Sequence, residues 1–447
     1  MSTREPADLL IEARWLLPIA PSNTVHTGQA VAVSAGRIVA VGPAAELRAR
    51  FEPGERVVRG QHALLPGLVN AHTCASHALL RGLAVRAPRA RWLSECVRPL
   101  ERRLMSAAYV REGTALAMAA MVRAGITCFA DLDLYPEEAA RAAAAAHMRA
   151  AIALPVTEDA SAWAEGATAH LARAERLWDE YRSDARISLY FAPLAPLALS
   201  DATLARVQRV ADELDARVAV HFGELTTEGA APASEVRDGA PAGEATARGA
   251  AAALGRLDAL GLLRPGFSAI GVSALGPGEL ELLANRGATL IVCPQAQLRL
   301  APGSVPALPF IPERTGLGTD SPLAAGAFDL LAEARTAALL AGLPAAAVMR
   351  LATLGGATAL GLAAQIGSIE PGKAADLICI ELSDQANAAA AQVPDAIVFG
   401  ATRAQVSDAW IAGRAALSAG RLVGFDEREL ADLAQCWAER AQLEAAA

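Results

Sequence analysis

The middle of the chain, from about residue 67 to about residue 364, alternates short apolar segments with longer helical segments. The helical segments include DATLARVQRVADELDA and GELELLANRG. The apolar segments are typical of buried strands: PGLVNAH, ITCFADLD, RISLYFAP, RVAVHFGE, FSAIGVSA, ATLIVCP and GLGTDSP. This alternation indicates a parallel sheet covered by helices, and a length of roughly 300 residues fits an α/β fold of the (β/α)8 TIM-type barrel class.

Both ends of the chain favour short strands instead. QAVAVSAGRIVAVG near the start and VSDAWIAGRAALSAGRL near the end are apolar runs broken by turn residues. The simplest arrangement of two β-rich ends around one barrel is a small β-sandwich built from both termini. We therefore expect four parts: sandwich residues 1–66, a barrel at 67–364, further sandwich residues at 365–425, and a C-terminal helix at 426–447.

The charge and cysteine content exclude several classes of protein. The net charge of -8 and the pI of about 5.5 argue against a partner that carries phosphates, so we expect neither nucleic acid nor a membrane surface. The six cysteines are dispersed without CxxC spacing, which indicates a reducing cytoplasm. The segment MSTREPADLLIEARW contains acidic residues and no apolar run, so we expect no signal peptide and a cytoplasmic location.

Metal-competent side chains follow three of the expected barrel strands. His72 is the last residue of GLVNAH and Cys74 lies two residues further on, while His221 and Asp320 end two later strands. Each has an ordinary structural explanation as well: packing for the His-X-Cys pair, a core or capping histidine, and a turn-capping aspartate. Because side chains at the carboxyl ends of barrel strands share one pocket, the four together predict a metal site, and zinc accepts all three residue types.

Several motifs carry a resemblance to a known family. The segments LLPGLVNAHT, FAPLAP, ELELLANRGATLIVCP, GTD and GSIEPGKAADL resemble the amidohydrolase superfamily, specifically the branch of chlorohydrolases and methylthioadenosine/S-adenosylhomocysteine deaminases, from near residue 7 to about 425. The resemblance implies a homo-oligomeric, metal-dependent hydrolase. Its reaction would be the hydrolytic deamination of a small purine-nucleoside-like substrate, which breaks a carbon–nitrogen bond other than a peptide bond.

The resemblance also assigns roles to individual residues. It implies that His72, His221 and Asp320 bind one zinc, iron or manganese ion, with Cys74 at the position of a fourth ligand. Glu224 matches a glutamate that shuttles protons.

On the substrate side, Trp92 and Glu101 match positions that meet the base and the ribose. Arg149 matches a substrate-side arginine.

Four positions depart from the family pattern. Cys74, Leu194, Gly223 and Ile270 stand where histidines are expected, and Ile270 replaces the one that contacts the attacking water. A thiolate can bind zinc, but its sulfur reaches roughly 2 Å less far than a distal histidine nitrogen, so occupancy of the site is in doubt; His77 is an alternative ligand. We expect weak or lost activity, and the alternative is an inactive relative that acts as a small-molecule-binding or partner subunit.

Overall fold

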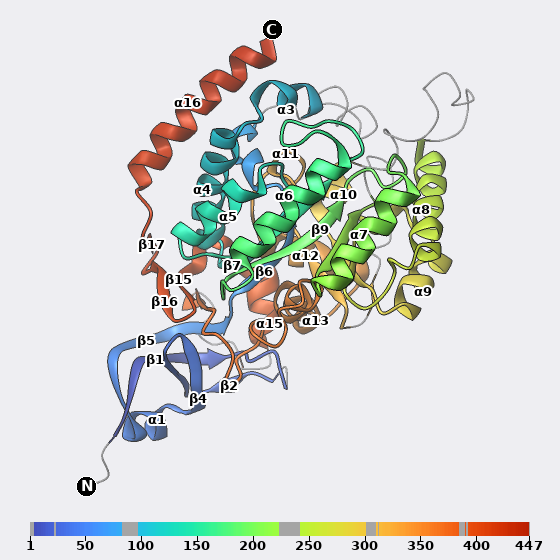
Figure 1. The fold of residues 1–447 in the computed structure, drawn as a ribbon. Coiled ribbons are helices and arrows are strands. Elements are labelled where there is room, and N and C mark those ends of the chain that lie inside the picture. The colour runs from blue at the N-terminus through green and yellow to red at the C-terminus, as the bar shows by residue number, and fades with distance from the viewer. Residues whose placement is uncertain are drawn as a thin grey trace.

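The computed structural model describes residues 4–21, 24–82, 97–222, 242–300, 310–311, 313–383, 389 and 392–446. Figure 1 shows two parts, a barrel formed by the middle of the chain and a sheet assembled from its two ends. The described helices include none that is long and apolar enough to span a membrane.

Eight parallel strands form the barrel in the order β13-β12-β11-β10-β9-β8-β7-β6. Between the two edge strands, Thr73 forms a parallel bridge with Asp320, and Thr319 N donates to His72 O at 3.0 Å. These contacts bring the first and last strands together, which confirms the predicted barrel class. The strands are β6 (Leu68–Thr73), β7 (Ile126–Asp131), β8 (Arg149–Val156), β9 (Ile187–Pro193), β10 (Arg217–His221), β11 (Phe267–Ile270), β12 (Thr289–Val292) and β13 (Thr315–Leu317).

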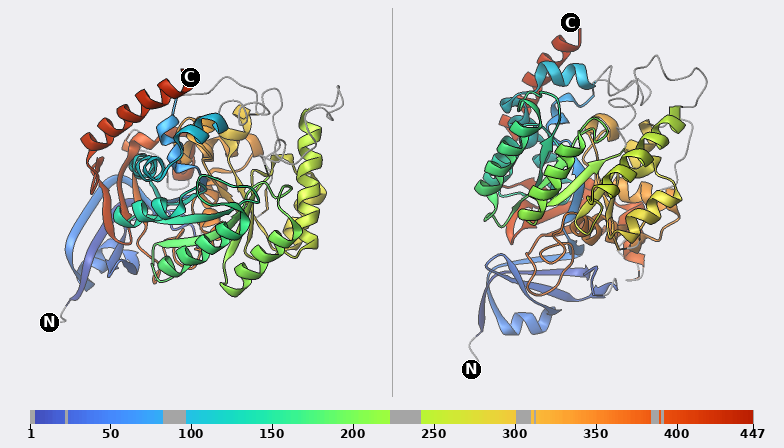
Figure 2. Two further views of the ribbon diagram at one scale, coloured as in Figure 1. Left: turned by 45° about the horizontal axis from the view of Figure 1, so that its top comes forward. Right: turned by 45° about the vertical axis from the view of Figure 1, so that its right-hand side comes forward.

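Helices cover the outside of these strands (Figure 2). Local sequence sets where several begin: the Ser106 side chain accepts a hydrogen bond from Tyr109 N, and the Ser200 side chain accepts one from Thr203 N. The helices are α3 (Arg98–Leu104), α4 (Ala107–Arg123), α5 (Pro136–Ala145), α6 (Gly166–Tyr181), α7 (Asp201–Glu213), α8 (Ala242–Ala259), α9 (Pro277–Asn285), α10 (Pro294–Leu300), α11 (Pro322–Ala325), α12 (Leu330–Ala341), α13 (Ala345–Arg350) and α14 (Gly356–Ala359).

The interior of the barrel is lined mainly by small side chains. Alanines from five strands and the larger residues Tyr190, Ile270 and Ile291 form one buried apolar cluster. Leu360, Leu362 and Ile366, which follow α14, belong to the same cluster and close it at the amino ends of the strands. The small strand residues leave space in the barrel, and the segment after α14 fills it from the amino ends of the strands, as close packing requires.

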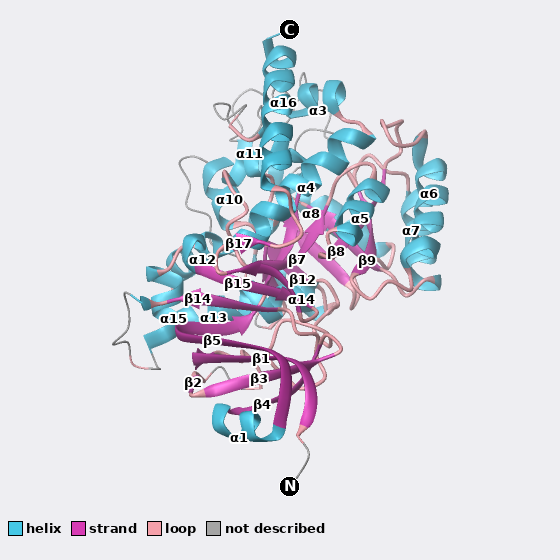
Figure 3. Ribbon diagram, turned by 90° about the vertical axis from the view of Figure 1, so that its left-hand side faces the viewer, coloured by secondary structure: helices cyan, strands magenta, loops and turns pink. Residues whose placement is uncertain are grey.

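The terminal strands form one continuous sheet, where the sequence predicted a sandwich. The reason is the long strand β5, which pairs in parallel with β1 and antiparallel with β14 and so joins the two ends of the chain. Figure 3 shows this sheet beside the barrel. Its elements are β1 (Glu5–Leu16), β2 (His26–Thr27), β3 (Gln29–Ser34), β4 (Arg37–Pro43), α1 (Ala44–Arg50), β5 (Phe51–Pro66), β14 (Leu377–Glu381), β15 (Val406–Ile411), β16 (Arg414–Ser418) and β17 (Arg421–Leu422). A short helix, α15 (Val393–Asp395), lies between β14 and β15 in the chain.

The last helix, α16 (Glu427–Ala446), packs against the barrel helices α3 and α4. Trp437 Nε1 donates to Glu112 Oε2 at 2.7 Å, and the Trp437 ring meets the Tyr109 ring edge-on with centroids 5.3 Å apart. These contacts hold α16 beside the end of the barrel at which the strands terminate.

Candidate metal centre at the carboxyl ends of the barrel strands

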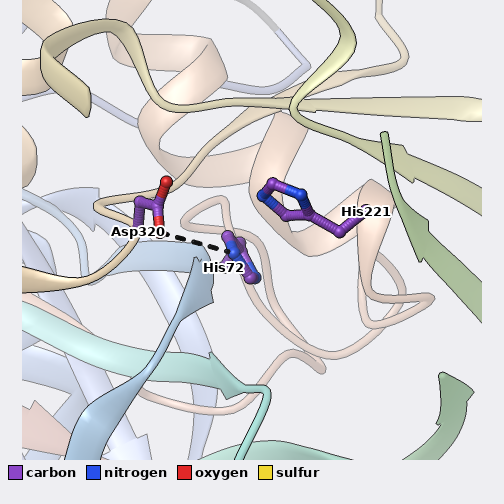
Figure 4. Close-up of side chains that lie close together, drawn as sticks. All are labelled: His72, His221 and Asp320. Atoms are coloured by element: carbon purple, nitrogen blue, oxygen red, sulfur yellow. Dashed lines mark ion pairs between the residues drawn. The ribbon is translucent and has the colours of Figure 1, made fainter. Parts of the chain in front are cut away.

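Three side chains from three barrel strands meet at the carboxyl ends of the strands. His72 lies in β6, His221 ends β10 and Asp320 follows β13. Their ligand atoms all lie within 4.8 Å of one another; His72 Nε2 is 3.9 Å from Asp320 Oδ1, and the two imidazole centroids are 5.1 Å apart. Figure 4 shows His72 between the other two side chains. Residues far apart in the sequence are thus gathered by closure of the barrel.

The environment of His72 keeps its ring neutral. The residue is 1% exposed, and burial lowers the pKa of His72 to about 4; the neighbouring His221 ring adds to this effect and Asp320 opposes it. A neutral imidazole has a lone pair to offer, which is the form that binds metals.

Both histidines contain a buried nitrogen that needs a partner. In the described part of the chain, Nδ1 of His72 and Nδ1 of His221 have no hydrogen-bond partner. Leaving such an atom unpaired costs about 1–3 kcal/mol. Two imidazoles and a carboxylate match the three protein ligands of a catalytic zinc site, in which a fourth position stays open. The three residues therefore fit a mononuclear metal ion.

Contacts with β6 fix the position of Asp320. Asp320 N donates to His72 O at 3.1 Å, and Thr73 Oγ1 donates to Asp320 O at 2.9 Å. The backbone of Asp320 is left-handed, with a φ of 53°, a conformation that costs a non-glycine residue about 1–3 kcal/mol and persists where surrounding contacts impose it. The strand that contains His72 thus also positions the aspartate.

Comparison with known proteins places this site in a family. The model of the Amidohydrolase family matches residues 63–416, which is most of the chain and includes all three residues of the metal centre. The chain belongs to the amidohydrolase family. A further model, the imidazolonepropionase-like composite domain of bacteria, matches residues 30–51 of the terminal sheet.

Individual relatives cover the whole length of this amidohydrolase. A 5-methylthioadenosine/S-adenosylhomocysteine deaminase of Teredinibacter turnerae is 32% identical over 98% of the chain and 99% of the relative. A crystal structure of an adenosine deaminase from Xanthomonas campestris with bound zinc is 37% identical, covers 99% of this chain and 100% of the other, and has a TM-score of 0.88. Atrazine chlorohydrolase from Arthrobacter aurescens TC1, at 18% identity over 96% of this chain and 100% of the other with a TM-score of 0.82, shares the fold.

Cys74 is not part of the three-residue group. Its Sγ lies 3.7 Å from Leu132 O, to which the thiol donates, and the chain turns after Cys74 into the 3-10 helix η1 (Ala75–Leu80). A sulfur one bond beyond Cβ cannot cover the distance that an imidazole ring spans. The structure therefore differs from the expected four-ligand set and brings only His72, His221 and Asp320 together.

Ile270 lies beside His221 in the barrel sheet. It is the direct pairing partner of His221 across β10 and β11, and it is 1% exposed in the barrel interior. Leu194, which follows β9, packs against the same apolar cluster. Two of the expected histidines are thus replaced by side chains that neither donate nor accept a hydrogen bond.

His77 is bound to other residues and does not serve as a substitute ligand in this structure. Its Nδ1 lies 2.8 Å from Ser321 Oγ and its Nε2 lies 2.9 Å from Glu101 Oε1. Burial alone would lower the pKa of His77, but the hydrogen bond and charge of Glu101 outweigh burial and raise it. In turn, the Glu101 pKa is lowered, because His77 outweighs the opposing effect of burial. His77 thereby holds Glu101 ionised and links it to the residue after Asp320.

Two buried aspartates support the loop after His72, and the sequence reading did not single them out. Ala75 N donates to Asp131 Oδ1 at 2.7 Å, and Ser76 N donates to Asp133 Oδ2 at 2.9 Å. Burial raises the pKa of both carboxyl groups, and the proximity of Asp133 raises that of Asp131 further. The available signal was the acidic end of the strand segment ITCFADLD, where acids recur two residues apart.

Arg149 requires a correction, because it does not lie on the substrate side. Its Nε donates to Asp376 Oδ2 at 2.7 Å, and its NH1 donates to Ala185 O at 2.9 Å. Strand register places Arg149 level with Val69, three residues before His72, which is about 10 Å along the strand. It therefore forms a buried ion pair at the amino ends of the strands.

Three of the residues discussed above cannot be placed. Trp92, Gly223 and Glu224 lie outside the described residues. The predicted roles of Trp92 at the substrate and of Glu224 in proton transfer stay predictions.

Proposed function

We propose that this amidohydrolase is a metal-dependent aminohydrolase, which releases ammonia from a small purine-nucleoside-like substrate. The observation that carries the proposal is the group of His72, His221 and Asp320, whose ligand atoms lie within 4.8 Å of one another at the functional end of a barrel. The substrate class is supported by relatives named as deaminases of 5-methylthioadenosine and S-adenosylhomocysteine and by the neighbouring structure named as an adenosine deaminase.

In this proposal the residues of the site have different roles. His72, His221 and Asp320 hold the metal ion, which supplies Lewis acidity and brings the pKa of a water towards 7. Glu224, three residues after His221, moves a proton from the attacking water to the leaving amino group. Trp92 packs against the base.

Glu101 binds the ribose in this proposal. Its carboxylate is held ionised by His77, so it is ready to accept hydrogen bonds from the sugar hydroxyls.

Ile270 limits the expected rate. General acid–base help in the transition state typically contributes about 10²- to 10⁴-fold, and an isoleucine beside His221 offers none. We therefore expect slow turnover with an intact metal site.

A second candidate function is that of an inactive relative that binds a small molecule or serves as a partner subunit. The apolar replacements Ile270 and Leu194 favour it, because they remove polar groups from the pocket while leaving the barrel well packed. This candidate and the deaminase differ in catalysis, so activity assays separate them.

The first experiment measures the metal content of protein purified without a histidine tag, before and after zinc supplementation. We expect close to one equivalent of zinc, iron or manganese per chain. Less than about a tenth of an equivalent after supplementation would contradict the proposal of a metalloenzyme. Ligands of a true metal site are held at bonding distances and should take up the metal that is supplied.

The second experiment assays ammonia release from adenosine, 5-methylthioadenosine and S-adenosylhomocysteine. We expect slow release by the natural chain and faster release by the Cys74→His, Ile270→His double variant. Activity in the double variant alone would favour the second candidate function, in which the natural chain is catalytically inactive. No activity in either protein, with metal bound, would exclude deamination of these substrates.

We further propose a homo-oligomer that works in the cytoplasm. Cys128 and Cys379 are buried and form no disulfide, in keeping with a reducing compartment. Light scattering on the eluate of a sizing column would measure the mass, and a monomer at micromolar concentration would refute the oligomer.

A further inference from the structure

The amino ends of the barrel strands contain a second cavity, on the opposite side from the metal centre. Its volume is about 520 Å³, which lies in the range of small-molecule sites. Ile187 of β9, Arg217 of β10 and Gly266 before β11 contribute to its lining. None of the three residues of the candidate metal centre lines it, so its occupant would be separate from the substrate.

Arg217 brings an uncompensated positive charge to this cavity. Its NH2 donates to Ala359 O at 2.9 Å and to Ser268 Oγ at 3.3 Å, both of which are neutral acceptors. Within the described ranges no carboxylate lies in ion-pair distance of Arg217, and burial alone lowers its pKa to about 10. The guanidinium therefore stays charged at neutral pH without a counter-ion from the described residues.

Arg217 is partly buried, and a charge that is partly removed from water is unfavourable unless something neutralises it. Removing an ion from water costs several kcal/mol, and an opposite charge is what offsets the cost. The nearby Arg149 shows the usual solution, since Asp376 lies 2.7 Å from its Nε. Arg217 uses one terminal nitrogen in the protein contacts above, whereas a guanidinium has five N–H donors in all. The remaining donors match the oxygens of a carboxylate or phosphate group.

The backbone beside Arg217 leaves room for its side chain. Gly361 has a φ of 75°, and a Cβ at this position would lie 2.9 Å from Arg217 Cδ. A larger residue would therefore displace the arginine stem. The glycine keeps the guanidinium in the cavity, where Ser188, Leu189 and Leu360 also lie.

The other residues that line the cavity indicate the chemistry of the rest of the ligand. Trp178, Tyr181 and Leu362 supply aromatic and aliphatic surface. Arg182 and Arg264 add positive charge, and Asp184 and Asp215 add negative charge. The Asp184 carboxylate is already engaged, because Arg186 N donates to its Oδ1 at 2.7 Å.

We propose that this cavity binds a small organic anion, whose carboxylate or phosphate group lies against the Arg217 guanidinium and whose apolar part packs on Trp178 and Tyr181. The site is independent of the proposed deaminase reaction. A ligand here would bind at the closed end of the barrel, beneath the interior cluster that separates it from His72 and His221.

Calorimetric titration with benzoate and with inorganic phosphate tests the site at constant ionic strength. Benzoate represents an organic anion, and phosphate an oxyanion without an apolar part. We expect benzoate to bind the natural protein more tightly than phosphate, in zinc-loaded and in chelator-treated samples alike. Arg217→Met should weaken benzoate binding by about 10- to 100-fold, the value of a charge-assisted contact. The control Arg286→Met removes an exposed arginine that is paired with Asp258 and should leave binding unchanged.

A crystal soaked with 4-bromobenzoate keeps the test decisive if Arg217→Met does not fold. An anomalous bromine signal in the cavity, with the carboxylate in hydrogen-bond distance of Arg217, would support the proposal. Bromine found only at the metal centre, no binding at millimolar concentration, or tighter binding of phosphate than of benzoate would overturn it. Equal loss of binding in Arg217→Met and Arg286→Met would also overturn it.

Discussion

At the carboxyl ends of the barrel strands, His72 and His221 each keep a buried Nδ1 that has no partner among the described residues. At the amino ends of the same barrel, Arg149 is held by two hydrogen bonds from its guanidinium to Asp376 and by a third to Ala185 O. Both sets of groups are buried and polar. They differ in whether the chain itself supplies the partner.

This difference separates structural from functional groups. A folded chain pairs nearly all of its buried polar atoms, so unpaired atoms that cluster with further metal-competent side chains favour a partner from outside. By this criterion the Arg149 pair stabilises the fold, and the histidine group fits a ligand site. Arg217 lies close to Arg149 in the barrel but resembles the histidines, since it has no counter-ion among the described residues. The comparison can be tested by removing one member of each set.

The largest effect is expected for the paired arginine. Arg149→Met leaves the Asp376 carboxylate buried without its counter-ion, and breaking a buried pair in this way costs about 3–5 kcal/mol. Urea denaturation of metal-free protein would measure the loss. Arg286→Met, which breaks an exposed pair, should cost about 0–1 kcal/mol. Similar losses in the two variants would contradict the structural role of Arg149.

The next effect concerns metal binding. Asp320→Asn should lower zinc affinity by more than the 10- to 100-fold that is typical for loss of an outer partner of a ligand, because it removes a ligand charge. Competition with a coloured zinc chelator would give the affinity. Cys74→Ser is the matched control and should bind zinc like the natural chain, because Cys74 Sγ contacts Leu132 O. A comparable loss of zinc affinity in Cys74→Ser would show that the Cys74 thiol is a ligand.

Some features of the fold and of the candidate site could be predicted from the sequence, and others could not. Seven barrel strands were visible as apolar runs with turn residues, but β8, within HMRAAIALPV, was hidden because it follows an alanine-rich helix and has alanines at its second and third positions. His72, His221 and Asp320 could be predicted because each follows an apolar run at a strand end. Sequence spacing could not show that Arg149 begins its strand, since strand register depends on pairing with β7.

Contacts formed by loops were harder still to predict. The reach of His77 to Glu101 and Ser321 depends on a 3-10 turn after the strand, and no periodic pattern precedes it. That none of the described residues supplies a counter-ion to Arg217 likewise becomes visible only once the neighbouring strands are in place.

A smaller, pH-dependent effect is expected for His77. The raised pKa of His77 gives stability that is present below its unfolded value and lost as pH rises through the folded value. The lowered pKa of Glu101 gives stability that is lost only as pH falls through its folded value, below about 4.5. His77→Gln should therefore cost about 1.5 kcal/mol near pH 6, the value of a hydrogen bond to a charged group, and less at pH 9.

Denaturation of chelator-treated protein at the two pH values would measure this difference. His26→Gln, at an exposed position in β2, is the control and should change stability equally little at both. A cost of His77→Gln that grows from pH 6 to pH 9 would show that the neutral ring is the stabilising form.

The smallest effect is expected for Arg217. Because its charge has no counter-ion among the described residues, Arg217→Met should change the free energy of unfolding by less than about 1 kcal/mol, since an apolar side chain of similar volume replaces a partly buried charge. The carbonyl of Ala359 keeps a partner in this variant, since Ser268 Oγ also donates to it at 2.9 Å. Urea denaturation in buffer without phosphate or carboxylates measures the intrinsic value. If benzoate raises the stability of the natural chain but not of Arg217→Met, the anion supplies the partner that Asp376 supplies to Arg149. A loss of 3 kcal/mol or more in anion-free buffer, as large as that of Arg149→Met, would mean that Arg217 is satisfied within the fold and that the two arginines do not differ.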